Sequence, residues 1–188
     1  MDVKTLAISD IKILTPKRFG DARGWFSEVF NAQTLKAAGI DFPVVQENTS
    51  FSAEVGTLRG LHFQTPPKAQ GKLVRVLKGR IWDVAVDIRE GSPSFGKWVG
   101  HEISADAGNQ ILVPVGFAHG FVTLEPQTLV GYLLSEHYSP VHDAGISWND
   151  PDLAIDWPEA AKTPILSAKD QIAPRLKDIV PPLSLVPA

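Results

Sequence analysis

Two histidines stand in glycine-containing patterns whose spacing could bring them to one chemical site. His62 ends the segment that starts at Gly56, with five residues between the glycine and the histidine. His119 ends the longer pattern G-x5-P-x-G-x2-H, which starts at Gly108. An imidazole titrates near neutral pH, so such a pair can transfer protons or bind a metal ion. Arg59, three residues before His62, can offer two parallel hydrogen bonds to a phosphate group.

The elements that must position these side chains are mostly strands. Apolar and polar residues alternate over residues 80–88, with Asp83 and Asp87 on the polar side, which predicts a half-buried strand. Residues 72–77 predict the preceding strand, and the turn at Lys78-Gly79 predicts that the two form a hairpin. Further strands are expected at residues 44–52, 57–63, 110–113, 120–124 and 128–134.

The spacing of Arg59 and His62 sets a local requirement. Residues three apart point to opposite faces of a regular strand, so the two side chains would not share a pocket. Gly60 lies between them, and a glycine inside a strand pattern is typical of a bulge. We therefore predict a bulge at Gly60 that turns both side chains toward one cavity.

Helix is scarce. Asn31 can cap a short helix that stops before Gly39, and Ser167 begins a capping-box pattern whose carboxylate is Asp170. The prolines after Val180 predict an extended or loose tail. We expect a single all-β domain over residues 1–188, a jelly roll of antiparallel strands with a few short helices. Its core is expected at about residues 44–135, with an N-terminal arm and a C-terminal helical segment packed on it.

Composition excludes several classes of protein. The chain has 18 lysines and arginines against 21 aspartates and glutamates, a net charge of −3, which gives no general attraction to nucleic acid or membranes. The lack of cysteine excludes disulfides, thiolate metal sites and cysteine nucleophiles. No segment approaches the ~20 apolar residues of a membrane span, and the N-terminus has no signal-peptide pattern. We expect a cytoplasmic protein that binds neither nucleic acid nor membrane.

Both histidine patterns resemble the paired motifs of the cupin superfamily, whose fold is a jelly roll. The second motif matches at every fixed position, but the first departs after His62. A metal-binding cupin has a second histidine two residues later and then a glutamate, whereas Gln64, Lys68 and Ala69 occupy those places here. A catalytic metal generally needs three nitrogen or carboxylate ligands. We therefore expect no metal and no other cofactor, which leaves the histidines free for proton chemistry.

A wider set of segments matches one family when taken together. They are residues 19–28, 46–52, 59–62, 69–75, 83–89, 116–121, Tyr132, Tyr138, 145–150 and 166–170. Over roughly residues 10–172 the chain resembles the dTDP-4-dehydrorhamnose 3,5-epimerases. The resemblance implies inversion of C3 and C5 of dTDP-4-dehydro-6-deoxy-D-glucose through an enolate, giving dTDP-4-dehydro-L-rhamnose for dTDP-L-rhamnose biosynthesis.

The resemblance assigns catalytic roles to four residues. His62 would be the base, and Tyr132 would be the acid on the opposite face of the sugar. Lys72 would stabilise the charge on the ketone oxygen, and Asp170 would orient His62. All four also fit structural roles. His62 could be a structural histidine and Tyr132 a core aromatic on one strand face, while Lys72 begins a strand and Asp170 occupies a capping position.

The resemblance also implies substrate contacts. They are assigned to Arg23, Glu28, Gln46, Glu47, Asn48, Arg59, His119, Asp143 and Lys169, with Tyr138 stacked on the thymine ring. Asp143 departs from the family, which usually has a glutamate there, so we expect that contact to adjust to a shorter side chain. In this family the segment from Arg23 to Glu28 reaches the site from a second subunit, which implies a homodimer.

Other functions remain open at this point. The chain could invert a single carbon in another deoxysugar pathway, or it could be a keto-isomerase on the same scaffold. It could also be a sugar-nucleotide-binding cupin without catalysis. A metal-dependent cupin oxygenase is the remaining class.

Overall fold

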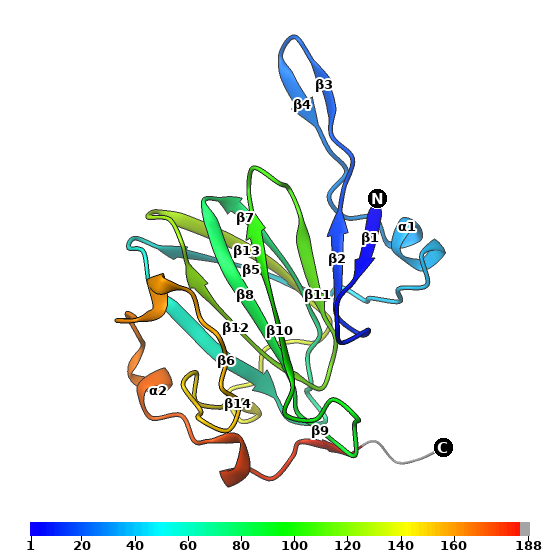
Figure 1. The fold of residues 1–188 in the computed structure, drawn as a ribbon. Coiled ribbons are helices and arrows are strands. Elements are labelled where there is room, and N and C mark those ends of the chain that lie inside the picture. The colour runs from blue at the N-terminus through cyan, green and yellow to red at the C-terminus, as the bar shows by residue number, and fades with distance from the viewer. Residues whose placement is uncertain (185–188) are drawn as a thin grey trace.

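The computed structural model describes residues 1–184, and most of its strands belong to two facing sheets (Figure 1). The six-stranded sheet has the order β1-β2-β11-β7-β13-β5, and the five-stranded sheet has the order β10-β8-β12-β6-β14. Every pairing within these two sheets is antiparallel. The predicted all-β jelly-roll class is therefore confirmed.

The strands of the two sheets have the following bounds. The six-stranded sheet contains Asp2–Thr5 (β1), Lys12–Thr15 (β2), Gln110–Val113 (β11), Lys72–Lys78 (β7), Thr128–Leu134 (β13) and Gln46–Ser52 (β5). The five-stranded sheet contains Trp98–Ser104 (β10), Arg80–Asp87 (β8), Phe117–Thr123 (β12), Leu58–Gln64 (β6) and Asp143–Gly145 (β14). The short strands Arg89–Glu90 (β9) and Leu183–Ser184 (β15) pair in parallel beside them.

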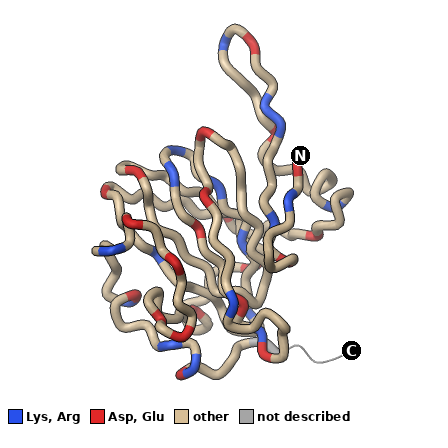
Figure 2. Tube along the Cα trace, viewed as in Figure 1, with Lys and Arg blue, Asp and Glu red and all other residues tan. Residues whose placement is uncertain are grey.

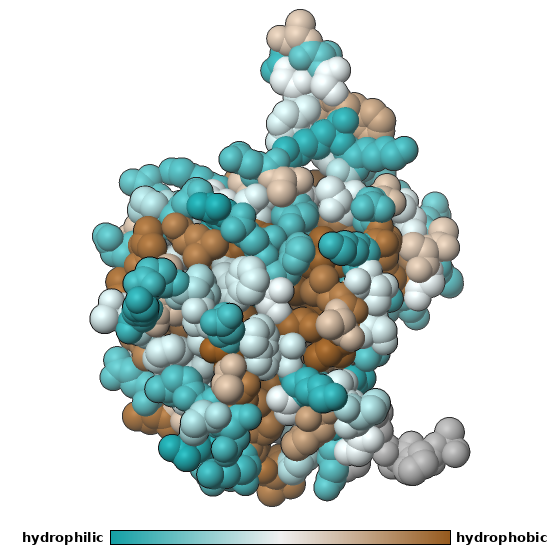
Figure 3. Space-filling model, in the orientation of Figure 1, coloured by the Kyte–Doolittle hydropathy of each residue, from teal (hydrophilic) through white to brown (hydrophobic). Residues whose placement is uncertain are grey.

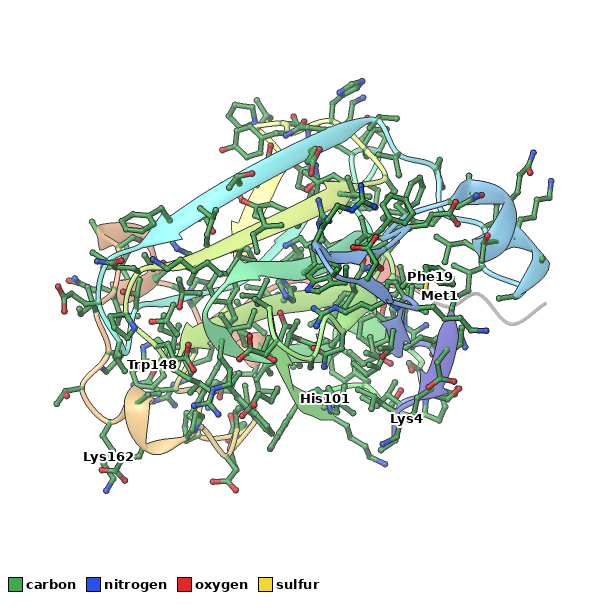
Figure 4. All side chains as sticks on the ribbon, turned by 90° about the horizontal axis from the view of Figure 1, so that it is seen from above. Met1, Lys4, Phe19, His101, Trp148 and Lys162 are labelled. Carbon is green, nitrogen blue, oxygen red and sulfur yellow. The ribbon has the colours of Figure 1, made fainter. Side chains whose placement is uncertain are left out.

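The main core lies between the two sheets. Viewed from above, side chains fill the space that the strands enclose (Figure 4). One apolar cluster takes members from both sheets, including Val74 and Val130 from the first and Ile81, Ala85 and Phe117 from the second. A second cluster, which includes Val84 and Val86, lies on the other face of β8. Both faces of the five-stranded sheet are therefore covered.

The predicted hairpin of residues 72–88 is wrong. The turn at Gly79 is present, with φ +84°, but β7 pairs with β11 and β13 while β8 pairs with β10 and β12. The chain therefore crosses from one sheet to the other at this turn. Alternation and a turn predict two strands, but partners are chosen by long-range packing, which a local pattern does not contain.

The prediction that β8 is half buried is also wrong. Ile81, Ala85 and Asp83 lie on the face toward the interior, and Asp83 has no exposed surface. The opposite, apolar face is covered by residues of the C-terminal segment, among them Leu153 and Leu176. The polar side of the pattern thus faces the enclosed space between the sheets rather than solvent.

Helices are few and short. Ala32–Ala37 (α1) is capped by the side chain of Asn31, and Ala168–Gln171 (α2) is capped by Ser167, as predicted. The 3-10 helices Glu159–Ala161 and Leu176–Asp178 lie in the C-terminal segment. No helix among residues 1–184 is long and apolar enough to cross a membrane. Of the predicted tail, Leu183–Ser184 is extended, and residues 185–188 lie outside the described part of the chain.

A two-stranded hairpin projects from the body of the molecule (Figures 1 and 3). It consists of Phe19–Asp21 (β3) and Gly24–Phe26 (β4). Its aromatic side chains are largely exposed, with relative exposures of 61% for Phe19, 59% for Trp25 and 69% for Phe26. The hairpin makes no sheet pairing with the rest of the described chain. Elsewhere charges of both signs are spread over the chain (Figure 2).

Candidate active site

A cavity of about 380 Å³ opens between the two sheets. We call it the central cavity. Its lining combines titratable and polar side chains with a few apolar ones: Ser50, Thr57, Leu58, Arg59, His62, Lys72, His119, Phe121, Tyr132, Ile165, Leu166, Ser167 and Asp170. All four residues predicted to be catalytic therefore line one cavity.

His62 and Asp170 form a hydrogen-bonded pair at this cavity. The Nε2 atom of His62 lies 2.6 Å from Oδ1 of Asp170. Burial opposes ionisation of Asp170, but hydrogen bonds from His62, Ser167 and the backbone of Gly60 hold the pKa of this carboxyl below its ordinary value. The carboxylate fixes the proton of His62 on Nε2, so Nδ1 is left as a basic atom. Ser167 caps α2 by accepting a hydrogen bond from the backbone NH of Asp170. Asp170 therefore lies in the first turn of this helix, and its carboxylate bonds His62 from there.

A bulge in β6 brings Arg59 and His62 to the same cavity. In the pairing with β12, His62 lies opposite His119 and Arg59 lies opposite Phe121. Two residues of β6 thus face the single residue Gly120, as in a β-bulge. This confirms the predicted bulge at Gly60. A β-carbon at Gly60 would lie 2.5 Å from the α-carbon of Gly120, and φ of Gly60 is +135°, so this position requires glycine.

His119 also pairs with an aspartate, which sequence reasoning did not assign. Its Nε2 lies 2.8 Å and 3.0 Å from the two carboxylate oxygens of Asp83, on the neighbouring strand β8. Burial lowers the pKa of His119, Lys72 and His62 lower it further, and Asp83 only partly opposes this. The available signal was a carboxylate inside the apolar run from Ile81 to Val86, because such a group is seldom buried without a partner.

Lys72 supplies a positive charge to the cavity, and its pKa is lower than that of an ordinary lysine. Its ammonium donates a hydrogen bond to the backbone oxygen of His62 at 3.2 Å. Burial lowers the pKa of Lys72 to about 8, although the charges of Asp83 and Asp143 oppose this shift. Lys72 is thus still mostly charged at neutral pH, but it lies closer to losing its proton than an exposed lysine does.

Tyr132 reaches the cavity from the sheet opposite His62. It lies on β13, between Asn48 on β5 and Val74 on β7, whereas His62 lies on β6 of the other sheet. Both side chains line the central cavity and also a smaller hollow beside it. An acid–base pair presented from facing sheets can approach a flat molecule from two sides.

The smaller hollow has three of the predicted substrate contacts in its lining, namely Asn48, Tyr138 and Asp143. It is lined by His62, Lys72, Tyr132 and also by Asn48, Phe63, Gln64, Gln70, Leu134, Tyr138 and Asp143. Lys169 forms an ion pair with Asp143, and the hydroxyl of Tyr138 donates to the same carboxylate at 3.3 Å. Gln46 accepts a hydrogen bond from the backbone NH of Tyr138 at 2.9 Å. These residues form one polar wall at the edge of the cavity.

Three predicted contacts lie away from this cavity in a single chain. Arg23 is at the tip of the projecting hairpin, and its hydrogen bonds within residues 1–184 go to Asp21 of the same hairpin. Glu28 is exposed and accepts a hydrogen bond from Asn31. Glu47 points to the outer face of β5, where it lies 3.7 Å from Arg75.

The histidines of the cavity are not part of a larger ligand set. Among residues 1–184, no group of three or more histidine, aspartate, glutamate or cysteine side chains is arranged to hold a metal ion. Gln64, two residues after His62, instead bonds backbone atoms of Lys68, His137 and Ser139. It therefore has a structural role in holding the loop between β13 and β14.

The sequence and the fold both match those of known proteins. The profile of a family described as dTDP-4-dehydrorhamnose 3,5-epimerase matches residues 5–178. An enzyme of that name from Salmonella typhimurium is 50% identical over 175 residues, which cover 93% of this chain and 94% of the relative.

Solved structures similar to this chain are also 3,5-epimerases. An epimerase of that name from Bacillus anthracis, with TDP and pyrophosphate bound, has a TM-score of 0.89 and 52% identity over 93% of this chain and 98% of its own. A dTDP-6-deoxy-D-glucose-3,5-epimerase from Legionella pneumophila, in complex with dTDP-4-keto-L-rhamnose, has a TM-score of 0.93 and 43% identity. That likeness covers 100% of this chain and 99% of the other.

The same fold also serves an enzyme of narrower scope. A 3'-monoepimerase from Streptomyces bikiniensis, in complex with dTDP-quinovose, has a TM-score of 0.85 and 34% identity over 92% of this chain and 87% of its own. Fold alone therefore does not separate one inversion from two. The profile match and the high identity over nearly the whole chain do settle the family: this chain belongs to the dTDP-4-dehydrorhamnose 3,5-epimerase family.

Proposed function

We propose that this protein inverts C3 and C5 of dTDP-4-dehydro-6-deoxy-D-glucose and releases dTDP-4-dehydro-L-rhamnose. The observation that carries the proposal is the placement of His62 and Tyr132 on facing sheets around one cavity. Inversion of a carbon requires a proton to leave from one face and a proton to return on the other. Two groups on opposite walls meet that requirement, and family membership supplies the substrate class.

The chemistry uses the acidity of a carbon next to a ketone. His62, through the nitrogen that Asp170 leaves free, removes the proton from C3 or C5. Charge then moves to the ketone oxygen, and the ammonium of Lys72 stabilises the enolate. Tyr132 returns a proton to the opposite face. His62 then releases its proton to solvent and Tyr132 takes one up, after which a second cycle inverts the other carbon. A well-placed acid–base group contributes on the order of 10²–10⁴-fold to such a step.

Nucleotide binding is assigned to the surrounding polar residues. Arg59 and His119 lie beside the catalytic groups, where Arg59 can pair with phosphate oxygens. Tyr138 is 54% exposed at the rim of the smaller hollow, which suits stacking on the thymine ring. Asp143 is shorter than the usual glutamate of the family, yet it still bonds Lys169 and Tyr138. We propose that this carboxylate orders the two side chains around the nucleotide.

We also propose that the protein is a homodimer in which the projecting hairpin completes the partner's site. Exposed aromatic side chains on an extension that pairs with no other strand among residues 1–184 are typical of an interaction surface. Arg23 at the hairpin tip would add a positive charge near the partner's bound diphosphate. Glu28, at the base of the same segment, would contact the substrate there too. Glu47 lies on the outer face of β5 and points away from the cavity of its own chain. It is therefore not placed to contact a substrate bound in that cavity.

The direct experiment is incubation with dTDP-4-dehydro-6-deoxy-D-glucose in D₂O, followed by NMR of the sugar. We expect deuterium at both C3 and C5 of an inverted product. Deuterium at one carbon only would identify a single-carbon epimerase, and absence of exchange at both would overturn the proposal.

A matched variant separates catalysis from binding. His62→Ala should lower turnover by about 10²-fold or more while dTDP binding changes little, because the nucleotide contacts lie elsewhere. Turnover that survived this change would show that His62 is not the base. A wild-type protein that bound dTDP without turnover would be a binding module.

Three further expectations stay predictions: the cofactor-free reaction, the single domain over residues 1–188 and the cytoplasmic location. Metal analysis of the purified protein, together with chelation, tests whether the reaction is free of cofactors.

A further inference from the structure

Ser50 carries a hydroxyl that the protein itself leaves unsatisfied. Its Oγ atom is buried and has no hydrogen-bond partner among the described residues. Ser50 also lines the central cavity, together with the catalytic residues His62 and Tyr132. A buried hydroxyl without a partner costs free energy, so its presence on the wall of a cavity indicates a group that a ligand satisfies.

Strand geometry fixes the direction of this hydroxyl. Along β5 the side chains alternate between the two faces, and Thr49 is on the exposed side. Ser50 pairs with Val130 on β13, one inward-facing step along the strands from the pair formed by Asn48 and Tyr132. Ser50 therefore lies on the same wall as the proposed acid, displaced along the strand direction.

Arg59 and its anchors form the rest of this corner. Its Nε donates to the hydroxyl of Ser52 at 3.3 Å, and its Nη2 donates to the backbone oxygen of Phe51 at 2.9 Å. The guanidinium is thus held against the strand that carries Ser50. The hydroxyl of Ser52 accepts a hydrogen bond from Arg59, whereas the hydroxyl of Ser50 has no partner among the described residues. The corner therefore offers a fixed cation and, beside it, a neutral group that both donates and accepts.

A neutral hydroxyl of the ligand is the natural partner for such a group. On the proposed substrate, C4 is a ketone and C6 is a methyl group, so ring hydroxyls remain only at C2 and C3. The C3 hydroxyl changes sides when C3 inverts, so one fixed side chain cannot hold it throughout. The C2 hydroxyl keeps its configuration. We propose that Ser50 hydrogen-bonds the C2 hydroxyl and holds the ring in place during both inversions, an inference that rests on the proposed function.

The test compares two substrates on two forms of the full-length protein. Wild type and Ser50→Ala are assayed with dTDP-4-dehydro-6-deoxy-D-glucose and with its 2-deoxy analogue, and kcat/KM is measured for each. We expect wild type to prefer the 2-hydroxy sugar by about tenfold, the worth of one hydrogen bond to a buried group. In Ser50→Ala that preference should fall to nearly one. Thr49→Ala removes the adjacent, outward-facing hydroxyl and should keep the preference of wild type.

A wrong assignment of Ser50 and a wrong assignment of epimerase activity would give different results. An unchanged preference in Ser50→Ala, or an equal loss of kcat/KM with both sugars, would overturn the assignment of Ser50 and leave the epimerase activity intact. Absence of turnover by wild type with the 2-hydroxy sugar would overturn the proposed function and this inference together. Thermal unfolding of both variants checks that the strand is preserved.

Discussion

Lys72 holds a proton in a place where burial works against it. Its pKa is lowered to about 8, so the charged form predominates at neutral pH and is lost at moderately alkaline pH. If the charge stabilises the enolate, activity must depend on the protonated form. The titration of this partly buried lysine thereby becomes visible in the pH dependence of the reaction.

We predict that kcat/KM falls as pH rises through about 8, because kcat/KM reports the pKa values of groups in the free enzyme. Arginine keeps its charge above pH 12, so Lys72→Arg should lack this alkaline fall, although its larger group will lower the rate. Lys72→Met should be poorly active at every pH. A wild-type profile that stays flat to pH 10 would show that the charge of Lys72 is not required.

Individual site residues differed in how well the sequence predicted them. His62, Lys72, Tyr132 and Asp170 were assigned together through a motif match, and the structure places them around one cavity. Asp83 was not assigned, because an alternating pattern does not reveal which face of a strand looks into the interior. Its pairing with His119 depends on β8 and β12 being neighbours in the sheet, and these strands are distant in the sequence.

At the scale of the element, the bulge in β6 decides whether Arg59 and His62 act together. The sequence predicted it, because two residues three apart can share a pocket only if the strand is irregular, and the glycine between them permits a bulge. Reasoning from local sequence failed for β7 and β8, which are adjacent in the chain but belong to different sheets. Local patterns predict strands and irregularities, whereas pairing depends on contacts between distant segments.

We predict that Gly60→Ala destabilises the protein by about 2 kcal/mol or more, since an alanine at this positive φ is strained. Its β-carbon would also press on Gly120, so the surviving folded protein should turn over more slowly as Arg59 and His62 lose their alignment. Denaturant unfolding and steady-state kinetics measure the two effects. Gly20→Ala, which meets only an ordinary contact at 3.7 Å, is the control and should change stability little. Equal behaviour of the two variants would contradict the importance of the bulge.

The projecting hairpin is the feature of the molecule that a single chain does not explain. It exposes three aromatic side chains and carries Arg23 away from the cavity of its own chain. In the proposed dimer, each site combines the sheets of one subunit with the hairpin of the other. That arrangement makes a specific prediction about mixed subunits.

We predict that Arg23→Ala and His62→Ala homodimers are both weakly active and that their co-expression restores activity. Each mixed dimer has one site with both changes and one with neither. With random pairing, half of the dimers are mixed, so recovery should reach about a quarter of the wild-type specific activity. No recovery in verified mixed dimers would show that Arg23 does not act on the partner's site.

His62 and Tyr132 are proposed to work on opposite faces of the sugar, and Tyr132→Phe in D₂O separates their two roles. With the acid removed, His62 can still withdraw a proton and return a deuteron to the same face. We therefore predict that recovered, uninverted substrate gains deuterium while formation of inverted product falls by about 10²-fold or more. Inversion at the wild-type rate would contradict these roles of His62 and Tyr132. Loss of both exchange and inversion would contradict them as well.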